Sequence, residues 1–206
     1  MNFEELGLCK EIISSINEKG YENPTEIQRI AIPHILMGRD LLGCAQTGTG
    51  KTGSFVMPLA EILSSGKSKS RMPRSLILAP TRELAMQVAE EFNFINKFLK
   101  LQMALLIGGV SFTEQDNKLA KGVDVLVATP GRLIDHIERG KVIIKDVKIL
   151  IVDEADRMLD MGFIPDIMKI NKLLPKIRQT LFFSATLSSE IRKIGKNLLI
   201  NPKEIT

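Results

Sequence analysis

A-Q-T-G-T-G-K-T, at residues 45–52, follows a short apolar run and precedes a stretch with helical spacing. Residues 40–44 are long enough for one buried strand, and apolar residues recur at helical intervals within 53–63. Gly48 and Gly50 let backbone N–H groups turn toward phosphate oxygens, Lys51 can reach β- and γ-phosphates, and the Thr52 hydroxyl can bind Mg²⁺. We interpret the stretch as a phosphate-binding loop. Ala45 stands where the general pattern G-x-x-x-x-G-K-[ST] has glycine, so the loop alone does not establish the fold.

The composition is that of a folded globular protein. The 206 residues are 44% hydrophobic and 25% charged, and this length suits one domain. A net charge of +4 permits a polyanionic partner without requiring one. Cys9 and Cys44 are isolated, so we expect neither a zinc site nor a disulfide framework, and a reducing cytoplasm is the expected compartment. The start of the chain has no basic, apolar leader, and no run approaches about 20 apolar residues, so we expect neither export nor membrane insertion.

Short apolar runs alternate with helical patterns along the whole chain. This alternation predicts an α/β fold with a mostly parallel central sheet and helices on both faces. A polar, basic loop is expected at 64–75. The expected strands are 40–44, 76–79, 103–107, 124–128, 148–153 and 180–183, and the expected helices include 4–19, 25–37, 53–63, 81–100 and 187–199.

Polar clusters follow most of the expected strands. Three carboxylates, Asp153, Glu154 and Asp156, come directly after the buried run 148–153. Ligands of α/β sheets bind beyond the carboxyl ends of the strands, so these carboxylates are expected to face the same crevice as the phosphate loop. Acidic residues also open helices merely as dipole partners, but three within four residues favour a functional role. The other clusters are Arg82, Gly108 with Gly109, Ser184 with Thr186, and the expected anion site Thr129 to Arg132 at a helix start.

Gln28 and Tyr21 precede the phosphate loop and could recognise a base. The carboxamide of Gln28 offers a donor and an acceptor together, which is the pair needed to read the N6 and N7 edge of adenine. Tyr21, the only tyrosine, could stack on a flat ring. The alternative is that Gln28 is a solvated helix residue and Tyr21 a partly buried core aromatic.

Taken in order from Phe3 to Thr186, these segments resemble the first RecA-like domain of a DEAD-box RNA helicase. Phe3 with G-Y-E-N-P-T-E-I-Q (20–28) resembles the Q motif, and 45–52 resembles motif I, in which alanine is usual at the first position. P-T-R-E-L-A (80–85) resembles motif Ia, T-P-G-R (129–132) motif Ib, D-E-A-D (153–156) motif II and S-A-T (184–186) motif III. The resemblance implies one RecA-like P-loop domain over residues 1–206, with the Q motif at 3–28 included.

The resemblance also implies an ATP-dependent RNA helicase that uses ATP and Mg²⁺ and binds RNA through its sugar-phosphate backbone. Lys51, Asp153 and Glu154 would be catalytic: Asp153 and Thr52 would hold Mg²⁺, the aspartate through water, and Glu154 would orient or deprotonate the attacking water. Ser184 and Thr186 would bond with Asp156, and these three residues would couple nucleotide state to RNA binding. The implied nucleotide contacts are Tyr21, Thr25, Gln28, Ala45, Gln46, Thr47, Gly48, Thr49, Gly50, Lys51 and Thr52. The implied RNA contacts are Pro80, Thr81, Arg82, Gly108, Gly109, Thr129, Pro130, Gly131 and Arg132.

Family members carry a second RecA-like domain with arginine fingers, and no H-R-x-G-R-x-x-R-like run follows Ser188. Because an arginine finger contributes about 10³ to 10⁵ in rate to related reactions, we expect residues 1–206 alone to bind ATP weakly and hydrolyse it poorly. A monomer is expected. Another P-loop enzyme, such as a nucleotide kinase, would share Lys51 and Thr52 but would not need 80–85, 129–132 or 184–186. A non-catalytic, ATP-dependent RNA clamp would be expected to lack Lys51, Asp153 or Glu154, and all three are present.

Overall fold

The computed structural model describes residues 1–66 and 71–206; residues 67–70, within the loop expected at 64–75, lie outside the described part. The described strands form one seven-stranded sheet in the order β3-β4-β2-β5-β6-β1-β7, and every neighbouring pair is parallel. This confirms the predicted α/β fold with a parallel sheet. The strands are β1 (Leu41–Cys44), β2 (Ser75–Leu78), β3 (Met103–Leu106), β4 (Val125–Ala128), β5 (Ile149–Val152), β6 (Gln179–Ser184) and β7 (Lys203–Ile205).

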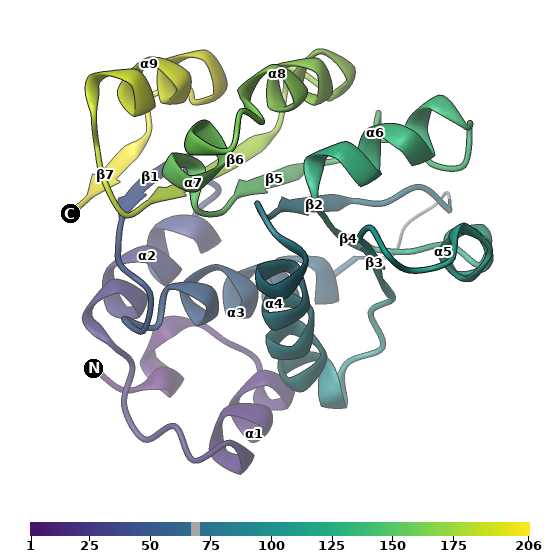
Figure 1. The fold of residues 1–206 in the computed structure, drawn as a ribbon. Coiled ribbons are helices and arrows are strands. Elements are labelled where there is room, and N and C mark those ends of the chain that lie inside the picture. The colour runs from purple at the N-terminus through teal and green to yellow at the C-terminus, as the bar shows by residue number, and fades with distance from the viewer. Residues whose placement is uncertain (67–70) are drawn as a thin grey trace.

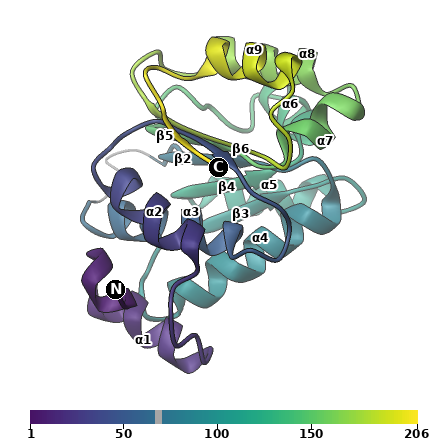
Figure 2. The ribbon, with the colours of Figure 1, turned by 90° about the vertical axis from the view of Figure 1, so that its left-hand side faces the viewer.

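Helices cover both faces of this sheet (Figures 1 and 2). On one face lie α1 (Lys10–Glu18), α2 (Glu26–Leu36), α3 (Lys51–Ser64) and α4 (Arg82–Ile95), and on the other lie α6 (Pro130–Glu138), α7 (Ala155–Asp160), α8 (Ile164–Leu173) and α9 (Ser189–Leu198). A further helix, α5 (Phe112–Ala120), packs beside β3. Successive residues of a strand point to opposite faces, so Ile151 joins the core under α1–α4 while Leu150 joins the core under α6–α9. A strand with two buried faces needs a continuous apolar run, as residues 149–152 have.

The N-terminal segment departs from the single helix expected at 4–19. A 3₁₀ helix (Phe3–Leu6) comes first, closed at its start by reciprocal Asn2 and Glu5 hydrogen bonds and at its end by Gly7, with φ at 89°. The chain then enters α1 at Lys10. A capping box and a left-handed glycine end this turn before the helical pattern can continue.

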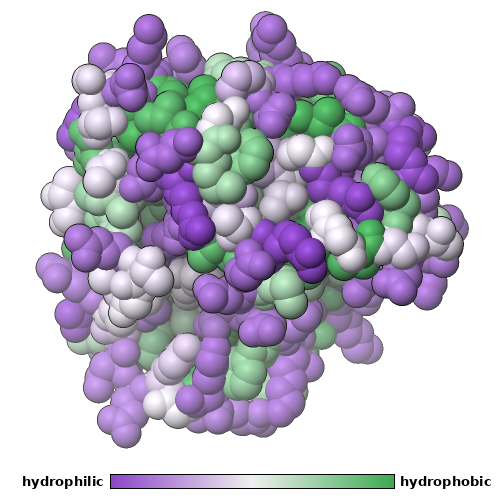
Figure 3. Space-filling model, viewed as in Figure 1, coloured by the Kyte–Doolittle hydropathy of each residue, from purple (hydrophilic) through white to green (hydrophobic). Residues whose placement is uncertain are grey.

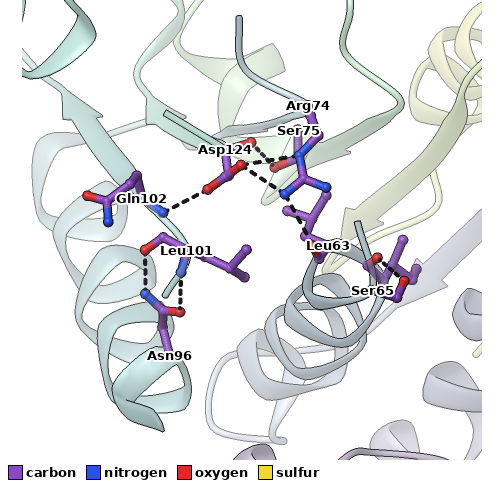
Figure 4. A network of polar contacts seen from close by, with 9 residues as sticks. Leu63, Ser65, Arg74, Ser75, Asn96, Leu101, Gln102 and Asp124 are labelled. Atoms are coloured by element: carbon purple, nitrogen blue, oxygen red, sulfur yellow. Dashed lines mark hydrogen bonds and ion pairs between the residues drawn. The ribbon is translucent and has the colours of Figure 1, made fainter. Parts of the chain in front are cut away.

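The helix expected to reach about Lys100 also ends early. α4 stops at Ile95, and a 3₁₀ turn (Asn96–Phe98) follows it. The Asn96 side chain accepts from Leu101 N and donates to Leu101 O, so it closes the turn that leads into β3 (Figure 4). Asparagine favours such local side-chain to backbone bonds over helix continuation.

Asp124 ties together the amino-terminal ends of three strands (Figure 4). Its carboxylate accepts from Arg74 Nη2 at 2.8 Å and from Gln102 N at 2.9 Å, just before β2 and β3 respectively. Arg74 Nη2 also donates to Leu63 O at 3.1 Å, which brings in the end of α3. Both charged side chains are 16% exposed. Charge-assisted bonds of this kind are among the stronger ones in proteins, so this group fixes one edge of the sheet.

Cys9 and Cys44 are both free and partly exposed. Burial raises the pKa of the Cys9 thiol to about 11, which keeps it protonated at neutral pH.

Within the described ranges, 1–66 and 71–206, no helix combines the length and the apolar character that crossing a membrane requires.

Candidate functional site

A pocket of about 430 Å³ lies at the carboxyl ends of the strands, between the starts of α2, α3 and the loop after β5. Its walls bring together segments that are far apart in the chain, as the strand polarity predicts. Ala45, Gln46 and Thr49 line instead a second hollow of about 340 Å³, beside Cys44 and Ile205. Of the candidate residues, Tyr21, Thr25, Gln28, Thr47, Gly48, Gly50, Lys51, Thr52, Asp153 and Glu154 line the first pocket.

The loop 45–52 turns into α3 through Gly50. This residue has φ at 84°, and a Cβ built on it would lie 2.6 Å from Thr25 Oγ1 and 2.8 Å from Gln28 Nε2. Both the backbone angle and the space therefore require glycine. α3 begins at Lys51, so the unpaired N–H groups of its first turn lie at the pocket and form a site suited to an anion.

Lys51 lies between the two carboxylates that follow β5. Its Nζ is 2.8 Å from Asp153 Oδ1 and 3.5 Å from Glu154 Oε1. The side chains of Lys51 and Asp153 are 6% and 4% exposed. Burial raises the pKa of the Asp153 carboxyl above its ordinary value, and the Lys51 ammonium opposes that rise. A cation and an anion taken out of water together in this way stabilise each other, whereas either alone would be costly.

Glu154 has a strained backbone. Its φ of 53° and ψ of 54° lie in the left-handed region, which non-glycine residues rarely occupy. The turn separates Asp153, which is buried, from α7, which begins at Ala155, and leaves the Glu154 carboxylate on the pocket wall. Strain of this kind is concentrated at functional sites, where surrounding contacts hold it in place.

Gln28 is buried, so its description as a solvated helix residue is wrong. Its Oε1 accepts from Thr25 N at 3.0 Å, and its Nε2 donates to Gly50 O at 3.1 Å. A carboxamide has two N–H groups and two lone pairs on its oxygen, so one donor and one acceptor position remain for a ligand. Tyr21 is 37% exposed on the wall of the same pocket.

A second group of candidate residues lies at the carboxyl ends of β2, β3 and β4. The Arg82 guanidinium packs over Gly109, where φ is 75° and a Cβ would collide with Arg82 Nη1. Arg132 Nη2 donates to Val110 O at 2.6 Å, next to the glycine pair. Thr129 occupies the N-cap position of α6 without a side-chain cap bond, and Pro130 is the first helical residue. Figure 3 has the same view as Figure 1. Hydrophilic residues gather in the middle of this view, where Figure 1 places the start of α4.

The family model for DEAD/DEAH box helicases matches residues 25–194 of this chain. The chain belongs to the DEAD/DEAH box helicase family. The resemblance inferred from the motifs is thereby confirmed.

Relatives of this DEAD/DEAH box chain extend the match to its whole length. It is 45% identical over 206 residues to the ATP-dependent RNA helicase DeaD of Buchnera aphidicola subsp. Baizongia pistaciae, covering 100% of this chain and 34% of the relative. It is 43% identical over 216 residues to the DEAD-box ATP-dependent RNA helicase 52A of Oryza sativa subsp. japonica, covering 97% of this chain and 36% of the relative. The chain thus spans about a third of the length of these curated relatives.

Two solved structures share this fold. A DEAD box protein from the hyperthermophile Methanococcus jannaschii superposes with a TM-score of 0.93 at 41% identity, over 100% of this chain and 55% of that one. A hypothetical ATP-dependent RNA helicase from Sulfolobus tokodaii gives a TM-score of 0.87 at 38% identity, over 95% of this chain and 56% of that one. The RecA-like architecture expected from the motifs is therefore confirmed.

Asp156 forms a hydrogen bond with only one of the two hydroxyls that were expected to contact it. Thr186 Oγ1 donates to Asp156 Oδ2 at 3.5 Å. Ser184 Oγ is buried and has no hydrogen-bond partner among the described residues, so the expected bond from Ser184 to Asp156 is not formed in this structure. Ser184 is the last residue of β6, paired in register with Cys44, and this pairing fixes its side chain in the interior.

α4 contributes pocket residues that the sequence analysis missed. Leu84, Gln87, Val88 and Glu91 all line the pocket. Their spacing places them on one face of a helix, so the pattern was visible in the sequence. Which face of α4 meets the pocket depends on how α4 packs against α3, and that contact is long-range.

Proposed function

We propose that this chain is the ATP-binding half of an ATP-dependent RNA helicase, which binds ATP with Mg²⁺ and part of an RNA backbone and requires a second RecA-like domain for turnover. The observation that carries the proposal is the placement of Lys51 at the start of α3, 2.8 Å from Asp153 and 3.5 Å from Glu154, on the wall of one pocket. A helix start with a fixed ammonium suits the phosphates of a nucleotide.

The oxygen atoms of side chains near Lys51 suit Mg²⁺ as ligands. Among the described residues, no group of three or more His, Cys, Asp or Glu is arranged to hold a metal. Mg²⁺ does not need such a group, because it usually keeps several waters and binds through one or two carboxylates together with substrate phosphates. The buried Asp153 carboxylate and the Thr52 hydroxyl would supply the protein's part of that shell. The ion would neutralise charge on the phosphates.

The remaining steps belong to side chains of the pocket. Lys51 would bind phosphate oxygens as a point charge, and the backbone N–H groups of 48–52 would bind the same anion. Glu154, whose carboxylate lines the pocket, would orient the attacking water or accept its proton. Gln28 would read the adenine edge with its remaining donor and acceptor, and Tyr21 would stack on the ring.

The RNA contacts would lie at the ends of β2, β3 and β4. Arg82, Gly109, Thr129 and Arg132 would bind the sugar-phosphate backbone of one strand, with Pro80, Thr81, Gly108, Pro130 and Gly131 shaping the surface. Contacts of this kind are independent of sequence and weaken with salt. The Thr186 to Asp156 bond would link the nucleotide pocket to this surface, with Ser184 joining it only after a rearrangement. We further propose that the intact protein is a monomeric cytoplasmic enzyme.

Comparing ATP hydrolysis by residues 1–206 with hydrolysis by the full-length protein, with and without RNA, tests this proposal. We expect weak, RNA-insensitive turnover from 1–206 and RNA-stimulated turnover from the full-length protein. In the latter, Glu154→Gln should keep ATP affinity and lose most turnover, because the amide is nearly isosteric but cannot accept a proton. The matched control is Asp160→Asn, which changes an exposed acid at the far end of α7, the helix that follows Glu154. Turnover by Glu154→Gln equal to that of the parent would show that Glu154 is only a carboxylate at a helix start.

A further inference from the structure

The guanidinium of Arg132 is held by three neutral neighbours. Its Nε donates to Gln115 Oε1 at 3.1 Å, and its Nη2 donates to Val110 O at 2.6 Å. Its Cζ lies 3.4 Å from the centroid of the Phe112 ring. A planar cation stacked on an aromatic face and bonded at one edge has little freedom to rotate. Arg132 is therefore a fixed group, unlike a typical surface arginine.

Gln115 connects this arginine to the loop that contains Gly108 and Gly109. Its side chain is 4% exposed, and its Nε2 donates to Ile107 O at 2.9 Å. Its Oε1 accepts from Arg132 Nε and lies 2.6 Å from His136 Nε2. The backbone oxygens that receive these bonds, Ile107 O and Val110 O, flank the glycine pair on both sides. One buried carboxamide thus fixes the loop and the arginine relative to each other.

Arg139 is the other arginine beside Phe112, and its guanidinium differs from that of Arg132 in having a carboxylate partner. Arg139 Cζ lies 4.1 Å from the same ring, but its Nη2 is paired with Asp116 Oδ2 at 3.1 Å. Within the part of the chain that the structure describes, Arg132 has no carboxylate partner. Two of its five N–H groups are used by the neutral acceptors, so three remain for an anion.

We propose that Phe112 and Gln115 are positioning residues, which hold Arg132 and the Gly108-Gly109 loop ready for a phosphodiester backbone. The inference rests on the proposed RNA-binding function. It adds two residues, Phe112 and Gln115, that belong to none of the motifs named above. Fixing a cation before its ligand arrives lowers the entropy lost on binding. Phe112 limits the rotation of the guanidinium, and Gln115 sets its distance from the loop. Neither residue needs to touch the RNA.

A double-mutant cycle in the full-length protein tests this arrangement. The measurement is the affinity for a fluorescent single-stranded RNA, by anisotropy, with ADP affinity and melting temperature recorded for every variant. The variants are Phe112→Leu and Gln115→Met, each alone and combined with Arg132→Ala. Each change introduces an apolar side chain close in size to the one that it replaces, so the helix is expected to fold. The matched control is Asn117→Ala, an exposed change on the same helix.

We expect Phe112→Leu and Gln115→Met to weaken RNA binding by roughly 3- to 30-fold when Arg132 is present and to add nothing once it is alanine, because they act through that residue. ADP affinity and the control should match the parent. If the losses persist undiminished in the Arg132→Ala background, or if RNA affinity does not change, the positioning role is refuted while the proposed function stands. If Arg132→Ala itself binds RNA like the parent, the proposed RNA contact of Arg132 is refuted, and this inference with it.

Discussion

Replacing Gln28 by alanine should destabilise the chain even without a nucleotide. The change removes the bonds from Thr25 N to Oε1, at 3.0 Å, and from Nε2 to Gly50 O, at 3.1 Å. Each hydrogen bond at such a buried position contributes about 1 kcal/mol to the free energy of unfolding, so the expected loss is about 2 kcal/mol. For a chain of this length, that corresponds to a melting temperature lower by roughly 4–8 °C.

The same substitution should separate ATP from GTP. If the remaining donor and acceptor of Gln28 read adenine, Gln28→Ala should weaken ATP binding by about 1–3 kcal/mol, in analogy with base-edge recognition elsewhere. Binding of GTP, which lacks that edge, should change less. The assays are thermal melting without nucleotide and displacement of a fluorescent ADP by ATP or GTP. Gln87→Ala is the matched control, because Gln87 lines the same pocket and is exposed.

Two results would refute this reasoning separately. A melting temperature equal to that of the parent would mean that the bonds to Thr25 and Gly50 contribute nothing to stability. Equal displacement by ATP and GTP in the parent protein would mean that Gln28 does not select adenine.

Three further predictions concern other parts of the molecule. Asp124→Ala should lower the free energy of unfolding by about 2–4 kcal/mol in chemical denaturation, because it leaves Arg74 and Gln102 N without their partner, while ADP affinity stays unchanged. Burial lowers the pKa of His136, which faces Asp116, Arg132 and Arg139, so the unfolded chain binds a proton first as the pH falls. Stability should therefore decrease below about pH 6.5, and His136→Gln should flatten that part of the profile; an unchanged profile would contradict the burial argument. Lys51→Ala should weaken ATP binding with or without Mg²⁺, whereas Asp153→Asn should weaken only the Mg²⁺-dependent part, as measured by titration in each condition.

Local patterns were sufficient to predict the centre of the fold and the meeting of Lys51 and Asp153 in one pocket. The loop 45–52 and the apolar run 149–152 are each recognisable in the sequence, and parallel strand polarity then brings Lys51 and Asp153 to one edge of the sheet. The whole DEAD/DEAH box match could be inferred from the order of such segments.

Long-range pairing explains what the sequence did not reveal. β7 is a three-residue strand whose place beside β1 depends on Lys203 N donating to Asp40 O, and no local pattern indicates it. The mostly polar helix α5 was not predicted either, although it contains the buried Gln115. Its burial follows from contacts with Ile107, Arg132 and His136, which become neighbours only in the folded chain.

Asp124 and Asp153 lie at opposite ends of the parallel strands: Asp124 directly precedes β4, and Asp153 directly follows β5, which is separated from β4 by β2. Parallel strands all run the same way, so every change at the Asp124 end is separated from the pocket by the length of a buried strand. A protein engineer who wants a more heat-resistant version of this domain should therefore begin around Arg74, Gln102 and Asp124. Substitutions there can be selected for durability alone, while the opposite end stays free to be selected for its ligands.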